Sequence, residues 1–226
     1  MKTSILVPVY NEAATILQLI EKVEASGLAD EIIVINDGST DKTAENLSTL
    51  KGEKYKIINL SKNGGKGIAL REGLKHVSNE IVIIQDADME YDPNDYAALI
   101  EPIKSGRTAV VYGHRLGLDK VSFNGFVFGR WLLTFLTNVL YKVELLDEPC
   151  GYKVFKTDVI KKIPLICRRF EFCPEITAKV VRSGYLIHQV PINYYPRTIH
   201  EGKKIRYRDG LIAVITLFRF RFWKAG

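Results

Sequence analysis

The stretch IVIIQDADMEYDP, residues 81–93, says most about the fold. Its first four residues are aliphatic and predict a short buried strand. Carboxylates then occupy every second position: Asp86, Asp88, Glu90 and Asp92. Side chains alternate along an extended segment, so Asp86, Asp88 and Glu90 should project to one side. Like charges repel, and this spacing therefore indicates a site for a hard cation such as Mg²⁺ or Mn²⁺. The alternative is an acidic surface loop.

The same order of a strand, a polar turn and a helical pattern recurs on both sides of this stretch. Apolar runs that predict strands occupy residues 4–9, 31–35, 56–60, 81–84 and 109–113. Helical spacing of apolar residues fills the intervals, which implies right-handed crossovers and a mainly parallel α/β sheet. Ligands of such sheets bind beyond the carboxyl ends of the strands.

Polar residues follow each predicted strand and should gather along that edge. Asp37 would accept hydrogen bonds from a ribose or a base there, or it would cap the helix that starts at Ser39 or Thr40. The loop NGGKG, residues 63–67, would bring backbone N–H groups and Lys66 to a phosphate, or it is only a flexible turn. Its spacing is not that of a Walker-type ATPase.

Composition indicates an ordinary globular chain in a reducing compartment. The 226 residues are 46% hydrophobic and 26% charged. The three cysteines form no CxxC pair, so neither a disulfide framework nor a zinc site is indicated. The first apolar run is about five residues long, shorter than the core of a signal peptide. We expect a cytoplasmic protein.

The net charge of +6 resides at the C-terminal end, where residues from Arg197 onward include eight Lys or Arg and two acids. An anionic partner, either phosphates or a membrane surface, should be met there, and we expect no nucleic acid. Two apolar segments, 123–141 and 211–226, also carry basic and aromatic residues. Arg130 interrupts the first, and neither segment reaches the about 20 uninterrupted apolar residues that a membrane-spanning helix needs. They are interfacial helices or helices of the core.

Five ordered motifs carry a family resemblance: VPVYNE (7–12), NDGSTD (36–41), KNGGKGIAL (62–70), QDADMEYDP (85–93) and YGHR (112–115). In this order they resemble family 2 inverting glycosyltransferases of the GT-A fold, and most closely the dolichyl- or polyprenyl-phosphate mannose synthases. The likeness runs from about residue 3 to 210. DEPCGYKVF (147–155) and RTIHEGK (197–203) resemble the acceptor-side half of that subgroup.

The resemblance implies one GT-A domain over residues 1–226. Its last part, 211–226, is a basic amphipathic helical tail. Residues 1–115 would bind the nucleotide-sugar and 116–210 the acceptor. Catalytic roles would fall to Asp88 and Arg115, and Asp88 and Glu90 would hold Mg²⁺ or Mn²⁺. The implied donor-binding residues are Pro8, Tyr10, Glu12, Ile35, Asp37, Lys66, Asp86, Ala87, Asp88, Arg115, Arg197 and Lys203.

Three residues depart from the pattern of the resembled family. Asn36 stands where an aspartate is frequent, and Cys150 where a small hydroxyl residue is frequent. Glu90 stands where the mannose synthases commonly carry glutamine, which adds negative charge at the second metal position.

The activity implied is inverting transfer of mannose from GDP-mannose to a polyprenyl or dolichyl phosphate. The enzyme would lie peripherally at the cytoplasmic face of a membrane. A phosphate acceptor is already anionic and needs no general base. A hydroxyl acceptor would need one, and Asp147 and Glu175 are the candidates, each of which has a structural alternative.

Three other functions stay open on the sequence. The first is transfer from UDP-glucose or another nucleotide-sugar to a lipid phosphate or a glycan. The second is a sugar nucleotidyltransferase, although such enzymes usually have a Gly-rich basic loop after the first strand, where this chain has Tyr10-Asn11-Glu12. The third is a catalytically silent sugar-nucleotide-binding module, which the intact Asp86 and Asp88 disfavour.

Overall fold

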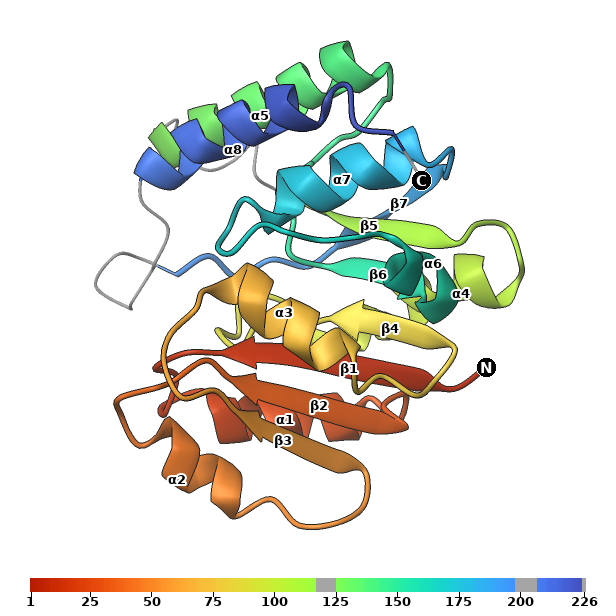
Figure 1. Ribbon diagram of the computed structural model, residues 1–226. Coiled ribbons are helices and arrows are strands. Elements are labelled where there is room, and N and C mark those ends of the chain that lie inside the picture. The colour runs from red at the N-terminus through yellow and green to blue at the C-terminus, as the bar shows by residue number, and fades with distance from the viewer. Residues whose placement is uncertain (117–124, 198–206, 225–226) are drawn as a thin grey trace.

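The computed structural model describes residues 1–116, 125–197 and 207–224. Its centre is a seven-stranded sheet in the order β3-β2-β1-β4-β6-β5-β7 (Figure 1). The strands are β1 (Thr3–Val9), β2 (Glu31–Asn36), β3 (Tyr55–Asn59), β4 (Ile81–Ile84), β5 (Val110–Arg115), β6 (Lys153–Lys156) and β7 (Ile187–Ile192). The mainly parallel α/β sheet predicted from the sequence is confirmed.

Strand β6 runs antiparallel to both of its neighbours, β4 and β5, whereas the other pairs are parallel. Neither β6 nor β7 was predicted from the sequence, and β6 separates the two strands expected at 81–84 and 109–113. The reversed direction has a consequence for the site. The chain enters β6 at the edge where its neighbours end, so residues 147–152 arrive beside the carboxyl ends of β4 and β5.

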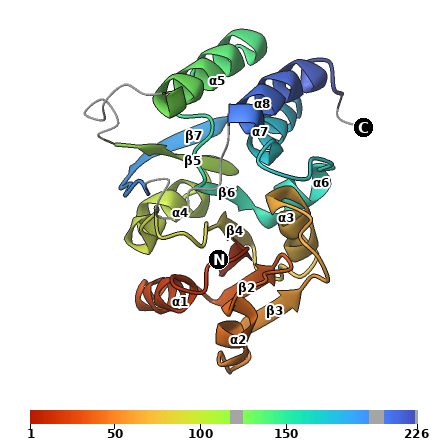
Figure 2. The same cartoon turned by 90° about the vertical axis from the view of Figure 1, so that its left-hand side faces the viewer.

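Helices cover both faces of the sheet (Figure 2). Side chains alternate along β1, so Ile5 and Val7 pack on one face and Leu6 on the other. Helices α1 (Ile16–Ala25) and α4 (Tyr96–Lys104) cover the first face. Helices α3 (Lys66–Leu74), α6 (Thr157–Lys162) and α7 (Phe172–Arg182) cover the second. Two short elements remain: α2 (Thr43–Ser48), which follows β2, and the 3-10 turn η1 (Pro93–Asp95), which precedes α4.

Helices α5 (Gly125–Tyr141) and α8 (Tyr207–Phe220) lie side by side beyond α7 (Figures 1 and 2). Leu133 of α5, Ala178 of α7 and Leu217 of α8 belong to one buried cluster that joins the three helices. The described residues of the two predicted segments, 125–141 and 211–224, therefore both pack against the domain with one side. Within the part of the chain that the structure describes, no helix has the length and apolarity that crossing a bilayer requires.

The start of α2 differs from the predicted one. The helix begins at Thr43, and neither Ser39 nor Thr40 caps it. Instead the side chain of Asn36 accepts the backbone N–H of Ser39 (3.1 Å), and that of Asp41 accepts the N–H of Thr43 (2.9 Å). Side-chain oxygens that bind nearby backbone amides stabilise a turn in place of a helix, which moves the first helical residue later in the chain.

Candidate active site

Asp86, the first acid after β4, is held in place by a lysine from another element. Lys66 is the first residue of α3, and its Nζ lies 2.5 Å from Asp86 Oδ1. Burial alone would lower the pKa of Lys66, but the hydrogen bond to Asp86 and the nearby negative charges, of which that of Asp86 is the strongest, together outweigh burial and raise that pKa. The backbone of Gly151 lies so close to Asp86 Oδ2 that a Cβ at residue 151 would collide with it. The turn before β6 thus forms one wall of the site.

Asp37 binds the NGGKG loop. One of its carboxylate oxygens accepts the N–H of Gly64 (2.7 Å), and the other accepts the N–H of Gly65 (2.8 Å). Asp37 does not cap the following helix, and its buried carboxylate fixes the loop that carries Lys66. The amides of Gly64 and Gly65 thus point to Asp37, which holds this part of the loop in place.

The alternating acids 88 and 90 flank a strained residue. Met89 has φ 62°, a left-handed conformation that costs energy for any residue with a side chain. Asp88 Oδ1 accepts the N–H of Glu90 at 3.2 Å. Burial, together with the negative charges of Asp86 and Glu90, raises the pKa of Asp88 to about 7. Asp86, Asp88 and Glu90 bring several hard oxygen donors together within five residues, and such donors suit a divalent cation.

Glu90 is engaged with the segment that follows β7. Its Oε1 accepts the backbone N–H of Arg197 (2.8 Å), and its Oε2 accepts the hydroxyl of Tyr194 (3.0 Å). No group of three or more His, Cys, Asp or Glu side chains is arranged as a metal site in residues 1–116, 125–197 and 207–224. An ion at Asp88 and Glu90 would therefore take further ligands from a bound phosphate or from water.

Arg197 reaches back across the site to the end of β1. Its guanidinium forms a two-pronged pair with Glu12, with Nη2–Oε1 at 2.8 Å and Nη1–Oε2 at 3.0 Å. The same Nη2 lies 3.5 Å from Asp88 Oδ2. The structure thus brings together three residues that the sequence analysis assigned to donor binding, although they are separated by up to 185 positions.

A second charged cluster lies at the end of β5. Arg115 pairs with Asp147 through two hydrogen bonds, Nε–Oδ2 at 2.7 Å and Nη2–Oδ1 at 2.8 Å. Arg130, on the inner side of α5, lies 3.8 Å from the same carboxylate. Burial alone would raise the pKa of Asp147, but the charge and hydrogen bonds of Arg115, with the charge of Arg130, hold it below its usual value. A carboxylate with a lowered pKa is a weak base.

Tyr194 connects the two clusters. Its hydroxyl donates to Glu90, and its ring lies under the guanidinium of Arg115, 4.9 Å from ring centroid to Cζ. Neither Tyr194 nor Gly151 was predicted from the sequence as a site residue. Arg130 was predicted only to interrupt an apolar run, although one cation on an otherwise apolar helix is itself a signal for a buried anion.

The other predicted residues fall at varied places. Pro8 and Ile35 lie opposite each other in the register of β1 and β2, and the side chain of Ile35 is buried against α3. Tyr10 is half-buried just beyond β1. The carbonyl of Ala87 accepts the hydroxyl of Thr15 at 2.9 Å. Lys203 lies outside the described residues.

Glu175 is fully buried in α7 and serves the local structure. Its oxygens accept the backbone N–H groups of Ile166 and Cys167, both at 2.8 Å, and pair with Lys179 Nζ at 2.6 Å. These contacts account for the burial of Glu175 without a role in a reaction.

Residues 4–164 match the family model of Glycosyl transferase family 2, and the chain belongs to this family. It is 28% identical to the dolichol-phosphate mannosyltransferase of Pyrococcus furiosus, an alignment that covers 90% of this chain and 59% of that protein. It is 25% identical to the dodecaprenyl-phosphate galacturonate synthase of Rhizobium johnstonii, covering 87% and 60%. The chain spans about three fifths of the length of these relatives.

The fold resembles that of glucosyl-3-phosphoglycerate synthase from Mycobacterium tuberculosis, solved in complex with Mn²⁺, UDP and glucosyl-3-phosphoglycerate. The TM-score is 0.74 at 22% identity, and the match covers 97% of this chain and 79% of that one. The predicted GT-A type of α/β fold is confirmed.

We expect the Asp147→Asn variant to lose about 3–5 kcal/mol of the free energy of unfolding at pH 7, because it leaves Arg115 buried without its counter-charge. The pKa of Asp147 is lower in the folded than in the unfolded chain. The stabilisation is therefore present above the unfolded value of about 3.9 and is lost as pH falls through the folded value.

Urea titrations at pH 7 and at several values between pH 4 and pH 2 measure this difference. The gap between the two proteins should narrow in acid, and a constant gap would contradict the assignment. Asp158→Asn is the matched control, because Asp158 is exposed and its only ion pair among the described residues is a long one, with Lys162 Nζ 4.0 Å from Asp158 Oδ2.

Proposed function

We propose that this chain is the catalytic part of an inverting glycosyltransferase that moves a sugar from a nucleotide-sugar to a polyprenyl or dolichyl phosphate at the cytoplasmic face of a membrane. Mannose from GDP-mannose is the first choice of donor. Relatives named for lipid-phosphate transfer of mannose, glucose and galacturonate support the acceptor class. The observation that carries the proposal is the cluster of Arg115, Asp147 and Arg130 beneath helix α5.

Helix α5 has two chemically different sides. An α-helix has 3.6 residues per turn, so Arg130 shares its side with Thr134, Thr137 and Tyr141, whose side chains are buried. The opposite side is exposed and apolar, and it consists of Phe128, Trp131, Phe135 and Val139. One helix therefore presents an apolar surface outward and an arginine inward to the end of β5.

Two arginines share one carboxylate in this cluster, which leaves an excess positive charge for an anion. The guanidinium fork matches phosphate oxygens, and Arg130 Nε is buried with no hydrogen-bond partner among the described residues. A lipid phosphate that approaches under α5 would meet both arginines. Residues 116–210 would thus supply the acceptor half of the site, and residues 1–115 the donor half.

On the donor side, the nucleotide-sugar would lie along the ends of β1, β2 and β4. We assign to it the charged residues Glu12, Asp37 and Asp86 at these ends and Lys66, which reaches Asp86 from the start of α3. Pro8, Tyr10, Ile35 and Ala87 from the same edge complete this set. Arg197 and Lys203 would reach the phosphates. A divalent cation held by Asp88 would supply positive charge to the diphosphate leaving group. Glu90 would join as a second ligand if it released the hydroxyl of Tyr194 or the N–H of Arg197. Complexes of the Mycobacterium tuberculosis synthase with Mn²⁺ or Mg²⁺ and UDP support this metal class.

The reaction would be a single displacement. An oxygen of the acceptor phosphate attacks the anomeric carbon, the bond from that carbon to the diphosphate oxygen breaks, and the configuration inverts. Arg115 and Arg130 hold and orient the acceptor phosphate, which is anionic at neutral pH and needs no base. The lowered pKa of Asp147 agrees with this, because Asp147 then acts as the counter-ion of the arginines and not as a base. Transfer to a sugar hydroxyl would need a stronger base than this.

Incubation of the protein with polyprenyl phosphate, Mg²⁺ or Mn²⁺ and either GDP-mannose or UDP-glucose tests the proposal. We expect sugar to enter the lipid fraction as nucleoside diphosphate is released in equal amount. Arg130→Gln should raise the KM for the lipid phosphate about tenfold or more, because a hydrogen bond to a charged group is worth about 1.5–3 kcal/mol. The matched control is Arg107→Gln, at an exposed arginine beyond α4.

The alternatives predict other products. Release of pyrophosphate with a nucleotide-sugar as product would indicate a nucleotidyltransferase, and transfer only to a soluble glycan would remove the lipid-phosphate acceptor. Donor binding without any product would indicate a silent module.

We expect Asp88→Asn to lower metal-dependent transfer about a hundredfold or more, because a metal ion contributes several kcal/mol to charge stabilisation in the transition state. The fold should persist, since the variant removes one excess negative charge from the cluster. Initial rates over a Mn²⁺ titration, with circular dichroism of both proteins, measure this. Asp92→Asn is the control, because Asp92 caps η1 and accepts the N–H of Asn94 (3.0 Å). Full activity of Asp88→Asn would remove Asp88 from the site.

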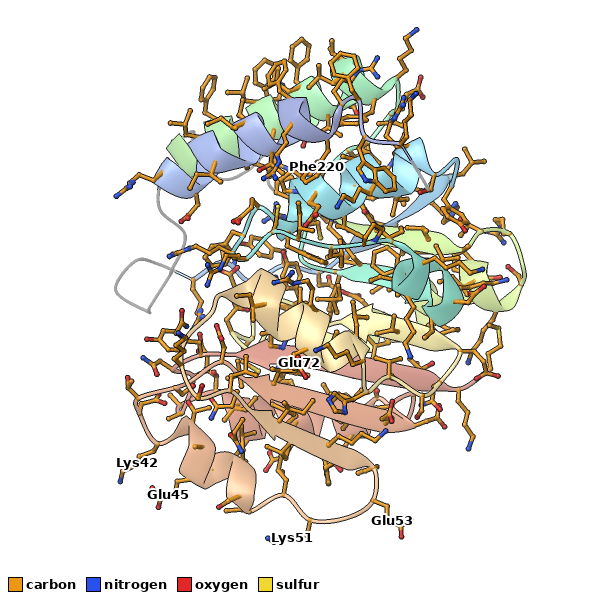
Figure 3. All side chains as sticks on the ribbon, in the orientation of Figure 1. Lys42, Glu45, Lys51, Glu53, Glu72 and Phe220 are labelled. Carbon is orange, nitrogen blue, oxygen red and sulfur yellow. The ribbon has the colours of Figure 1, made fainter. Side chains whose placement is uncertain are left out.

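The outer side of α5 and α8 supplies the proposed membrane surface. Side chains project from this side away from the rest of the molecule (Figure 3). Phe128, Trp131 and Phe135 of α5 stack in a row, with centroids 6.1 and 5.5 Å apart, and Trp131 is 55% exposed. Leu211, Ile215 and Phe218 continue the apolar surface on α8. Basic residues lie at the two ends of α8, as expected of a helix at an anionic interface: Arg208, Arg219, Arg221 and Lys224.

We expect the double variant Trp131→Ser with Phe135→Ser to reduce partitioning into vesicles of phosphatidylcholine and phosphatidylglycerol at least about tenfold, since burial of each ring is worth about 1.5–3 kcal/mol. Sedimentation with vesicles measures it. Leu186→Ser is the matched control, because Leu186 is 84% exposed and lies just before β7. Equal partitioning of the double variant and the wild type would remove the membrane surface. Deletion of α8 is a poorer test, because it uncovers the buried cluster around Leu217.

A further inference from the structure

A cation of the protein stands beside the carboxylate that the proposed metal site uses. Asp88 is that carboxylate, and Arg197 Nη2 is 3.5 Å from its Oδ2. The same guanidinium holds Glu12 by two hydrogen bonds of 2.8 and 3.0 Å. Its position between two acids makes Arg197 the counter-charge of the cluster in this state.

Further hydrogen bonds hold the segment that carries Arg197 in this position. The N–H of Arg197 donates to Glu90 Oε1 (2.8 Å), and the N–H of Tyr195 donates to the carbonyl of Glu90 (2.9 Å). Asn193 donates twice to Asp95, at 2.8 and 2.9 Å. Residues 193–197 are thus fastened to the loop that carries the acids, and the side chain of Arg197 is only 17% exposed.

One N–H group of the Arg197 guanidinium stays unsatisfied in this position. Its Nε is buried and has no hydrogen-bond acceptor among the described residues. An unsatisfied buried donor costs free energy, so the guanidinium is held by its charge contacts with Glu12 and Asp88 and not by complete hydrogen bonding. A cation held in this way can be replaced by another cation that binds the same oxygens more strongly.

The oxygens in question are shared. A divalent cation at Asp88 would sit in the field of Glu12 and Glu90 as well, and a guanidinium within contact distance of Asp88 would repel it. Metal and Arg197 therefore favour different arrangements of the same cluster. Two ligands that compete for one group lower each other's affinity by the same factor.

We propose that Arg197 is a resident cation that neutralises the acid cluster while the metal is absent, and that it must leave Asp88 before a divalent cation binds. Arg197 thereby sets the metal affinity of the enzyme. This inference rests on the proposed metal-dependent function and names a residue that regulates its metal site. The arginine released from Asp88 is then available to another anion.

Titration of the protein with Mn²⁺ alone, by isothermal calorimetry, tests the inference. We expect Arg197→Gln to bind Mn²⁺ about tenfold more tightly than the wild type, within the usual range of coupling between two sites. Arg197→Lys keeps the charge without the fork and should lie between the two. Arg107→Gln should leave the affinity unchanged.

Equal or weaker binding by Arg197→Gln, or no measurable binding by any of the proteins, would overturn the inference. The double variant Asp88→Asn with Arg197→Gln must lose the gain, and a gain that persists without Asp88 would also overturn it. Thermal unfolding gives a second readout: without metal, Arg197→Gln should melt below the wild type, and Mn²⁺ should raise its Tm by more than it raises that of the wild type.

The titration contains no donor or acceptor, so its outcome is separate from that of the transfer assays. A protein that shows the predicted Mn²⁺ affinities but transfers no sugar would refute the proposed function alone. A protein that transfers sugar but shows no change of affinity on loss of Arg197 would refute this inference alone.

Discussion

Repulsion between carboxylates is the constraint on which the rest of this structure depends. The carboxyl edge of the sheet collects Glu12, Asp86, Asp88 and Glu90, and the turn before β6 adds Asp147. Each group of acids is offset by a cation from a distant part of the chain: Lys66 for Asp86, Arg115 and Arg130 for Asp147, and Arg197 for Glu12. The edge can form only when all of these segments are folded, so the acids tie the N-terminal strands to the C-terminal half.

Sequence reasoning reached the elements whose pattern is local. The strands of the first half stand out because each is an apolar run that ends in a polar turn, and the motifs after β4 and β5 locate the acids and Arg115. It missed β6, because lysines stand at both ends of its four residues and leave only Val154 and Phe155 as an apolar run. It missed β7, where half-buried residues and Pro191 blur the strand pattern.

The site itself was predictable as a set of residues but not as a set of contacts. Asp37 was expected to face a ligand or a helix end, and it binds the amides of Gly64 and Gly65. Glu90 was expected to hold a metal ion, and without one it accepts the backbone N–H of Arg197. Both carboxylates bind main-chain N–H groups, which every residue except proline offers, so nothing in the side-chain sequence marks the partner. The pairing of Arg197 with Glu12 depends on the path of the chain after β7, which the sequence does not reveal.

The distance between the two sides of helix α5 has a consequence for the kinetics of the proposed reaction. An α-helix with its side chains is about 10–12 Å across, and this is the depth that separates the exposed aromatic row from Arg130. In the proposed function the aromatic row rests in the headgroup layer. The acceptor phosphate would then move about one helix diameter out of that layer to reach Arg130, while its lipid tail stays in the bilayer. The enzyme would then sample its acceptor in two dimensions. Its turnover would follow the mole fraction of lipid phosphate in the membrane, and dilution of the suspension at constant membrane composition would leave it unchanged.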